Sequence, residues 1–181
     1  MARIIVRPHL NKAAATKLVK NFGGILSGKE IDVHGIRDVF FGTMAFHLYT
    51  KMYQAFLQKS VGGVDELGEA WLPLSESTIK RRVSAWFTAK YPLSADLQIN
   101  RVDDTLLNSL KPGTLSKTYI PSPNQYFNYQ RGNLHLGSSL NYASYVHAKR
   151  PLWPDDMTPW VSEAISKAIE ATILHIKRLV E

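Results

Sequence analysis

One unbroken apolar stripe runs through the C-terminal segment that begins at Thr158, and no other feature restricts the fold as strongly. Pro159 follows at the first helical position, where proline is well tolerated. The stripe recurs every three or four residues, at Val161, Ala164, Ile165, Ala168, Ile169, Thr172, Ile173, Ile176 and Val180. Such a face must be covered by a sheet or another helix. The segment is therefore predicted to be an amphipathic helix packed on another layer.

A second long helix is predicted from about Asp32 to Gln58. Apolar residues again recur at helical spacing, at Ile36, Val39, Phe40, Met44, Leu48, Met52, Ala55 and Phe56. Gly42 lies inside this helix and costs it about 1 kcal/mol relative to alanine. His47 lies beside the stripe and is interpreted as a core or edge histidine rather than a ligand.

Short elements are predicted between the two helices. Ser75 is a good cap for a short helix that carries Ile79, Val83 and either Trp86 or Phe87. LQINRVDDTLLNSL reads as a short strand followed by one or two helical turns, and SKTYIPS reads as a strand. QYFNYQRGNLHLGSS reads as a hairpin that turns at Gly132-Asn133.

Together these elements predict a single α+β domain that covers residues 1–181. An antiparallel sheet would be covered by the long helix of the N-terminal half and by the C-terminal amphipathic helix. A chain of 181 residues fits one domain and buries roughly 70% of its unfolded surface. The chain has no cysteine, which excludes disulfides, thiolate metal sites and a cysteine nucleophile.

The charge is concentrated near the N-terminus. Residues 1–29 hold six Lys or Arg and no acid, whereas the rest of the chain holds sixteen basic and fifteen acidic residues. A helix is predicted from about Asn11 to Phe22, so the segment of about 1–29 is expected to be basic and helical. It could meet nucleic acid or an acidic partner, or it could simply be a solvated basic face.

Candidate catalytic and metal-binding residues are few. No two histidines stand at metal-ligand spacing, and no catalytic or nucleotide-binding motif is present. His135, His147 and Ser138 form the one conceivable hydrolytic set. Arg81-Arg82 are interpreted as solvated, and the pairs Asp103-Asp104 and Asp155-Asp156 as helix caps. No catalytic residue, metal or cofactor is expected, and the chain is predicted not to be an enzyme.

Four motifs in serial order carry a resemblance to a known family. They are WLPLSESTIKRR, then TLLNSL (Thr105 to Leu110), then LGSSLNYASYVHA, and finally KRPLWP before the terminal helix. Their order between Trp71 and Glu181 resembles the tailed-phage virion-morphogenesis family of neck, tail-completion and tail-terminator proteins. In that family the third motif corresponds to a strand with a tyrosine-alanine-x-tyrosine pattern.

The resemblance implies a structural virion protein, made in the host cytoplasm, that forms a ring at the head–tail joint or tail terminus. The implied partners are copies of itself in a ring, which in that family is commonly a hexamer, together with neighbouring neck, connector or tail-tube proteins and genomic DNA in the lumen. No apolar run approaches the roughly 18 residues of a membrane span, so no membrane partner is expected.

The resemblance also suggests which residues meet those partners. Aromatic anchors for the ring interface are predicted at Trp71, Tyr142, Tyr145, Trp153 and Trp160, although each could equally fill the core. Small residues at Ser138, Ser139, Ala143 and Ser144 would allow close strand approach. The basic residues that could face the DNA-filled lumen of the ring or an acidic neighbouring ring are Arg3, Arg7, Lys12 and Lys17.

Two other functions remain open. The basic N-terminal segment would suit a nucleic-acid-binding accessory protein, whose affinity should fall steeply with salt. A histidine-centred hydrolase would require His135 and His147 for its activity.

Overall fold

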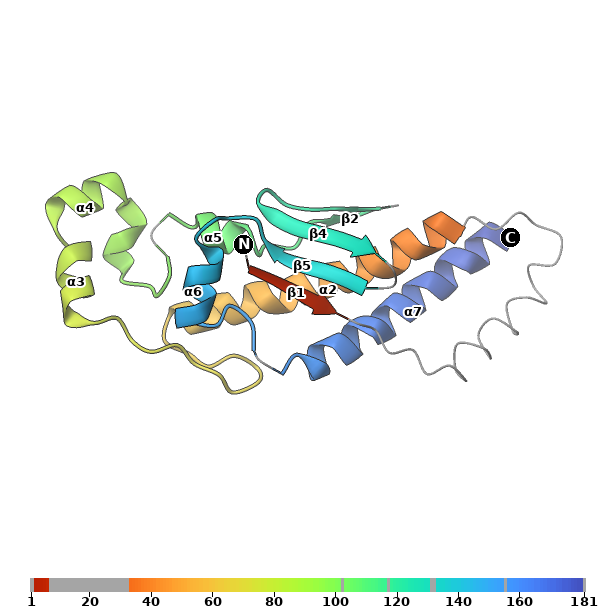
Figure 1. Cartoon of the computed structure of the whole chain (residues 1–181), viewed down its shortest axis with the longest axis horizontal. Helices are drawn as coiled ribbons and strands as arrows, with labels where there is room; N and C mark the ends of the chain where they lie inside the picture. The colour runs from red at the N-terminus through yellow and green to blue at the C-terminus, as the bar shows by residue number, and fades with distance from the viewer. Residues whose placement is uncertain are drawn as a thin grey trace.

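The computed structural model describes residues 2–6, 33–101, 103–116, 118–130, 133–154 and 156–180. Helix α2 (Val33–Ser60) is the spine of the molecule (Figure 1). Its buried hydrophobic side chains are Phe41, Met44, Ala45, Leu48, Tyr49, Met52, Ala55 and Phe56. The predicted helix is confirmed to within two residues at each end. Its buried face is wider than the predicted stripe because α2 has neighbours on two sides.

Helix α7 (Thr158–Val180) runs antiparallel to α2 and packs along it (Figure 1). Its buried residues are Trp160, Ala164, Ala168, Thr172 and Ile176, so the predicted stripe is confirmed. The small alanines let the two helices approach closely. Before the helix, the Asp156 carboxylate accepts a hydrogen bond from the Thr158 amide at 2.9 Å, which is the predicted capping role. Asp155 lies outside the described residues.

A three-stranded antiparallel sheet has the order β1-β5-β4. Strands β4 (Gln125–Gln130) and β5 (Asn133–Ser138) form the predicted hairpin. Gln130 pairs with Asn133, so Asn133 belongs to β5, and the prediction that it lies in the turn was wrong. Strand β1 (Ala2–Val6) pairs with β5 from Ala2↔Ser138 to Val6↔Leu134. The first residues are therefore a strand, and the predicted helix at 11–22 lies outside the described residues.

The hydroxyl of Tyr49 fastens α2 to the sheet. It lies 2.7 Å from the Tyr126 carbonyl oxygen and 2.8 Å from that of Gly137, and it accepts a bond from the Gly137 amide at 3.0 Å. Burial raises the pKa of Tyr49 above its ordinary value, so the side chain stays neutral and keeps its proton to donate. A helix side chain thus bonds directly to the backbone of two strands.

A smaller sheet of β2 (Thr114–Leu115) and β3 (Tyr119–Ile120) crosses α2. The strand SKTYIPS is confirmed in its central residues. A Cβ on Gly42 would stand 3.0 Å from the Tyr119 Cβ, so the glycine inside α2 allows this close crossing. A Cβ on Gly113 would stand 2.1 Å from the Ile120 carbonyl oxygen, which no side chain could tolerate. Burial raises the pKa of Tyr119, which packs on Gly113, to about 12.

Short helices occupy the remaining chain. They are α3 (Glu76–Arg82), α4 (Ala85–Lys90), the 3-10 helix η1 (Pro92–Asp96), α5 (Thr105–Asn108) and α6 (Ala143–Lys149). The Ser75 hydroxyl accepts from the Thr78 amide at 3.3 Å, which confirms it as a cap. The strand predicted before Thr105 is wrong, since Ile99 lies in a turn between left-handed Leu97 and Asn100.

The predicted α+β class is confirmed, with one correction near the C-terminus. The stretch after β5 that resembled a tyrosine-containing strand is helix α6, so Ala143 and Ser144 do not lie in a strand. The long helix α2 contacts both sheets, whereas α7 packs mainly on α2. One core joins α2, α7, the inner face of β5 and the segment around Trp153.

Candidate interaction surfaces

The conceivable hydrolytic residues do not converge. Ser138 and His135 lie at odd separation on β5, so their side chains point to opposite faces of the sheet. Ser138 is fully buried on the face toward α2. His147 lies on α6, where its Nδ1 accepts a bond from the Leu152 amide at 3.1 Å and its ring lies 4.4 Å from that of Trp153. The three residues therefore lie in different environments and do not form the conceivable hydrolytic set.

Within the part of the chain that the structure describes, no group of three His, Asp or Glu side chains could hold a metal ion. The predicted pair Asp103-Asp104 caps α5 in part, since the Asp103 carboxylate accepts from the Thr105 amide at 3.1 Å. Asp104 instead forms an ion pair with Arg101. Each carboxylate of this pair thus has a structural partner.

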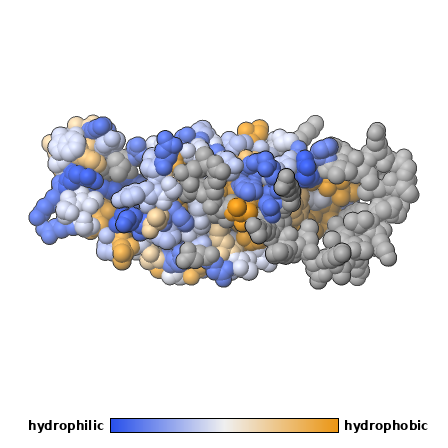
Figure 2. Space-filling view, viewed as in Figure 1, coloured by the Kyte–Doolittle hydropathy of each residue, from blue (hydrophilic) through white to orange (hydrophobic). Residues whose placement is uncertain are grey.

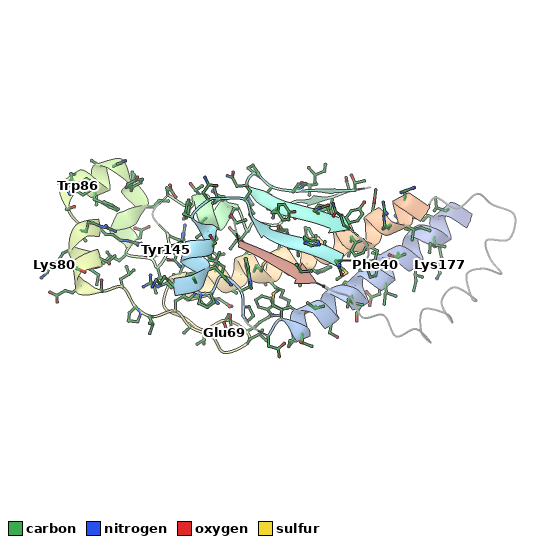
Figure 3. All side chains as sticks on the ribbon, viewed as in Figure 1. Phe40, Glu69, Lys80, Trp86, Tyr145 and Lys177 are labelled. Atoms are coloured by element: carbon green, nitrogen blue, oxygen red, sulfur yellow. The ribbon has the colours of Figure 1, made fainter. Side chains whose placement is uncertain are left out.

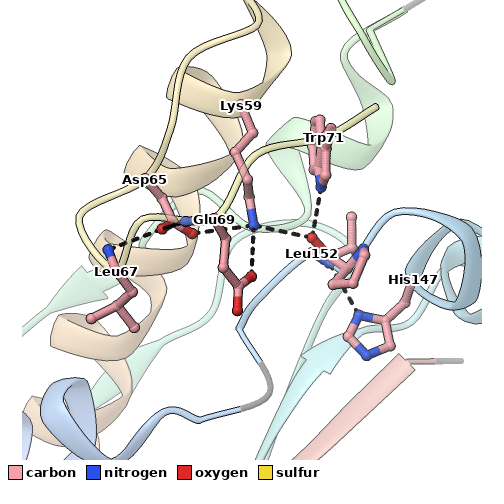
Figure 4. Close-up of polar contacts among 8 residues, drawn as sticks. Lys59, Asp65, Leu67, Glu69, Trp71, His147 and Leu152 are labelled. Carbon is pink, nitrogen blue, oxygen red and sulfur yellow. Dashed lines mark hydrogen bonds and ion pairs between the residues drawn. The ribbon is translucent and has the colours of Figure 1, made fainter. Parts of the chain in front are cut away.

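The most buried polar cluster surrounds Lys59 at the end of α2 (Figure 4). Its ammonium lies 3.2 Å from an Asp65 carboxylate oxygen and donates to the Pro151 carbonyl at 3.2 Å. Glu69 is 3.7 Å away. The other Asp65 oxygen accepts from the amides of Leu67 and Glu69 at 3.0 Å each. Because the Lys59 and Asp65 side chains are both fully buried, removal of either partner would leave an uncompensated buried charge and destabilise the fold.

This cluster also explains the position of Trp71. The indole donates to the same Pro151 carbonyl at 2.8 Å, and the Lys59 ammonium lies 5.5 Å from its ring centroid. The cluster thereby joins three stretches that are distant in sequence: the end of α2, the loop at residues 61–75 and the segment before α7. Its geometry is that of a structural clamp.

The predicted aromatic anchors divide into two groups. Trp71, Trp153 and Trp160 are 5%, 6% and 2% exposed, so they fill the chain's own core. For these three the interface prediction is corrected, because a side chain already enclosed by its own fold has no surface left to offer. Tyr142 and Tyr145 are 44% and 68% exposed. They are the predicted anchors that remain accessible.

Besides Tyr142 and Tyr145, exposed apolar side chains lie on the helical lobe. The lobe is defined as residues 76–96 and contains α3, α4 and η1. These helices pack mainly on one another and project from one end of the molecule (Figure 1). Phe87 is the buried aromatic of the lobe, and it lies apart from the main core. Val83 and Trp86 are 54% and 64% exposed, and Figure 2 shows hydrophobic and hydrophilic residues side by side at this end. The sequence pattern predicted that either Trp86 or Phe87 lies on the apolar face of this helix, and Phe87 is the buried one.

Two arginines fasten the lobe to the rest of the chain. Arg82 is buried and donates to the carbonyls of Gln98 and Arg101, on the chain that leaves the lobe. Arg150 donates to the carbonyls of Leu72 and Pro73, on the chain that enters it. Desolvation and the nearby charge of Arg150 lower the pKa of Arg82 from its ordinary value. The prediction that Arg82 is solvated was wrong, because backbone carbonyls replace the water around it.

The exposed charges of the lobe are mainly basic. The exposed cations of the lobe are Lys80, Arg81 and Lys90 against two exposed acidic residues, Glu76 and Asp96, whereas Arg82 is buried. Lys80 pairs with Glu76 at 2.7 Å on the surface, and the Arg81 guanidinium lies 5.4 Å from the Phe87 ring centroid. The lobe therefore presents cations beside exposed apolar side chains.

Acidic side chains gather on a different part of the surface, named here the acidic patch (Glu66, Glu69 and Glu163). Lys51 bridges Glu66 and Glu163 at 3.0 and 2.9 Å, so these carboxylates from a loop and from α7 are neighbours. The hydrogen bond from Lys51 holds the pKa of Glu163 below its usual value. Val64, 58% exposed, starts the same loop and pairs with Ala70. This patch was not predicted, because its members come together only in the fold.

The basic N-terminal residues are only partly described. Arg3 belongs to β1, where its backbone pairs with Gly137. Arg7, Lys12 and Lys17 lie outside the described residues, so their predicted place at a lumen or an acidic neighbour stays a prediction. None of the helices that the structure describes has the length and apolar composition needed to cross a membrane.

Comparison with models of known protein families, with curated proteins and with solved structures finds no match for this chain. The class that the fold defines is an α+β protein, with a helix-backed antiparallel sheet and a projecting helical lobe.

Proposed function

We propose that this chain is a structural protein of a tailed-phage virion, which forms a ring at the head–tail joint or at the tail terminus. The single observation that carries an assembly role is the helical lobe. It projects from the body and exposes Val83 and Trp86, although a buried position would stabilise such side chains by about 1.5–3 kcal/mol each. Contact with another chain would supply that burial.

The order of motifs supports the virion assignment. WLPLSESTIKRR leads into α3, and TLLNSL contains α5. KRPLWP supplies the Pro151 carbonyl of the clamp, and its Trp153 belongs to the main core. Each motif that resembles the phage family therefore has a definite place in one fold. Buried polar residues such as Lys59, Tyr49 and Arg82 hold that fold together.

Tyr142 and Tyr145 are the proposed aromatic contacts with ring neighbours or with an adjacent neck, connector or tail-tube protein. Both lie at α6, beside the Ser138–Ala143 connection from the sheet. Burial and the nearby Asp103 carboxylate raise the pKa of Tyr142, so its phenol keeps its proton as a hydrogen-bond donor at neutral pH. Tyrosine combines a large apolar ring with that donor, which suits an interface.

The experiment that tests the proposal starts from purified virions of the phage whose genome encodes this chain. Mass spectrometry should detect the chain at a fixed, small copy number per particle, and electron microscopy should place a ring at the neck or tail end. Particles made without the gene should have unjoined heads and tails or tails of uncontrolled length. Absence of the chain from the particles would refute the proposal.

A nucleic-acid-binding accessory protein is the second candidate, favoured by the six basic and no acidic residues of segment 1–29. It would bind duplex DNA with an affinity that falls steeply between about 50 and 200 mM salt. Deleting residues 7–29 should abolish that binding. A chain that does not bind DNA at low salt would remove this candidate.

A further inference from the structure

The helical lobe and the acidic patch are complementary in two respects. The lobe combines Arg81 and Lys90 with exposed Val83 and Trp86. The acidic patch combines Glu66 and Glu163, which share the single cation Lys51, with Val64, which is 58% exposed on the same loop as Glu66. A basic surface with an apolar centre thus has an acidic counterpart with an apolar centre on the same chain.

The two surfaces do not face each other within one molecule. Lys80 and Trp86 lie on the lobe at one end of the molecule, whereas Glu69 lies on the loop below the body, near the start of α7 (Figure 3). Arg82 and Arg150 hold both connections of the lobe by bonds to backbone carbonyls. The lobe is therefore held in one position on the body, away from the acidic patch of its own chain.

We infer that the helical lobe of one copy docks on the acidic patch of a second copy of this chain. Such a contact is heterologous, because each copy uses one surface and leaves the other free. Repetition builds a chain of subunits, which becomes a ring when the rotation between neighbours closes. The inference rests on the proposed function and names the surfaces that would build its ring.

Cysteine cross-linking tests the contact directly, because the natural chain has no cysteine. Val83→Cys on the lobe and Val64→Cys on the patch are combined in one chain, and both sites are exposed. Mild oxidation, or a short bis-maleimide, should then yield a ladder of covalent multimers on a denaturing gel. Either cysteine alone should yield dimers at most, since a heterologous contact needs both surfaces.

The matched control combines Val64→Cys with Leu179→Cys, which is 45% exposed on α7 and belongs to neither surface. We expect at least tenfold more trimer and larger products from the Val83–Val64 pair than from this control. Equal yields from the two pairs, or products no larger than dimers, would overturn the inference.

Charge reversal gives a second test. One variant carries Arg81→Glu with Lys90→Glu, and the other carries Glu66→Lys with Glu163→Lys. Each variant alone has two surfaces of the same charge, so its cross-linked ladder should shrink at least tenfold. An equimolar mixture restores opposite charges at every contact and should restore the ladder. A mixture no better than its components would overturn the inference. Lys111→Glu with Lys177→Glu makes the same charge change outside both surfaces and should leave the ladder intact.

These outcomes separate the inference from the proposed function. If the chain is found in a virion ring but the Val83–Val64 pair does not cross-link, the ring uses other surfaces and the proposed function stands. If the ladder forms but virions lack the chain, the self-contact stands and the proposed function fails.

Discussion

The body and the helical lobe of this molecule are stabilised in different ways. In the body, α2 contributes four fully buried side chains, Met44, Leu48, Met52 and Phe56, and packs against α7 and both sheets. In the lobe, Phe87 is the buried aromatic, and it packs against Trp86, Tyr91 and the Arg81 guanidinium. Where the lobe meets the body, a groove of about 380 Å³ remains between Val61, Leu74, Ile79 and Leu97.

The body therefore supplies the stability of the fold, whereas the lobe supplies the contact surface of the proposed function. The body buries enough apolar surface to fold on the usual hydrophobic driving force. The lobe keeps apolar side chains outside and relies on arginine–carbonyl bonds for its position. Phe87 lies outside the main core, so we expect the body to fold without a contribution from the lobe.

The largest difference in stability between body and lobe is expected when one lysine in each, Lys59 or Lys80, is replaced by methionine. Lys59→Met removes the partner of buried Asp65, and we expect it to lower the free energy of unfolding by about 3–5 kcal/mol. Lys80→Met removes only a surface pair with Glu76 and should change stability little. Urea denaturation followed by circular dichroism measures both. Similar losses for the two variants would contradict the account of the clamp.

A pair of tyrosines gives the next largest effect. Tyr49→Phe leaves the Gly137 amide and a strand carbonyl without their buried partner, and we expect a loss of about 1–3 kcal/mol. Tyr145→Phe, at an exposed ring, should leave the free energy of unfolding unchanged. The same urea titration applies, and an unaffected Tyr49→Phe variant would show that the hydroxyl does not fasten α2 to the sheet.

The lobe itself should respond locally. Arg82→Met removes the bonds to the Gln98 and Arg101 carbonyls, so amides in residues 76–101 should exchange hydrogen faster while those of α2 stay protected. Hydrogen–deuterium exchange with mass spectrometry measures this. Arg81→Met is the matched control, since the Arg81 side chain is exposed, and it should leave exchange near the natural rate. Faster exchange throughout α2 would mean that the lobe and the body unfold together.

The smallest expected effect is a pH dependence in the body. Desolvation lowers the pKa of His47, the Glu163 carboxylate opposes this shift, and the charges of Lys167 and Lys51 add to it. The unfolded chain therefore binds a proton more readily, so stability is lost as pH falls through the unfolded value of about 6.5. His47→Gln should reduce the loss measured between pH 7.5 and 5.5 by thermal denaturation. An unchanged pH profile would refute the assignment, and His34→Gln, at an exposed site, is the control.

The sequence predicted the elements whose signal is local. The stripes of α2 and α7, the β4–β5 hairpin and the Ser75 cap each depend on residues within a few positions of one another, and each is confirmed. Strand β1 was not predicted, because five residues become a strand only through pairing with β5, far along the chain. Arg82 was misjudged for a similar reason, since its carbonyl partners follow at residues 98 and 101.

The surfaces were harder to predict than the fold. Residue type alone does not distinguish Trp160, which is buried at the start of α7, from Trp86, which is exposed on α4. The acidic patch depends on Lys51 bringing Glu66 and Glu163 together from separate elements. Such constellations require the tertiary structure.

The pairing of Ala2 with Ser138 has a consequence for synthesis of the chain on the ribosome. Strand β1 emerges first, but its partner β5 follows about 130 residues later. At roughly 5–20 residues per second, β1 waits for about 6–26 seconds before it can pair. The sheet is therefore completed late, after all of α2 has been made. Until β5 is synthesised, β1 and β4 have no central strand to join them.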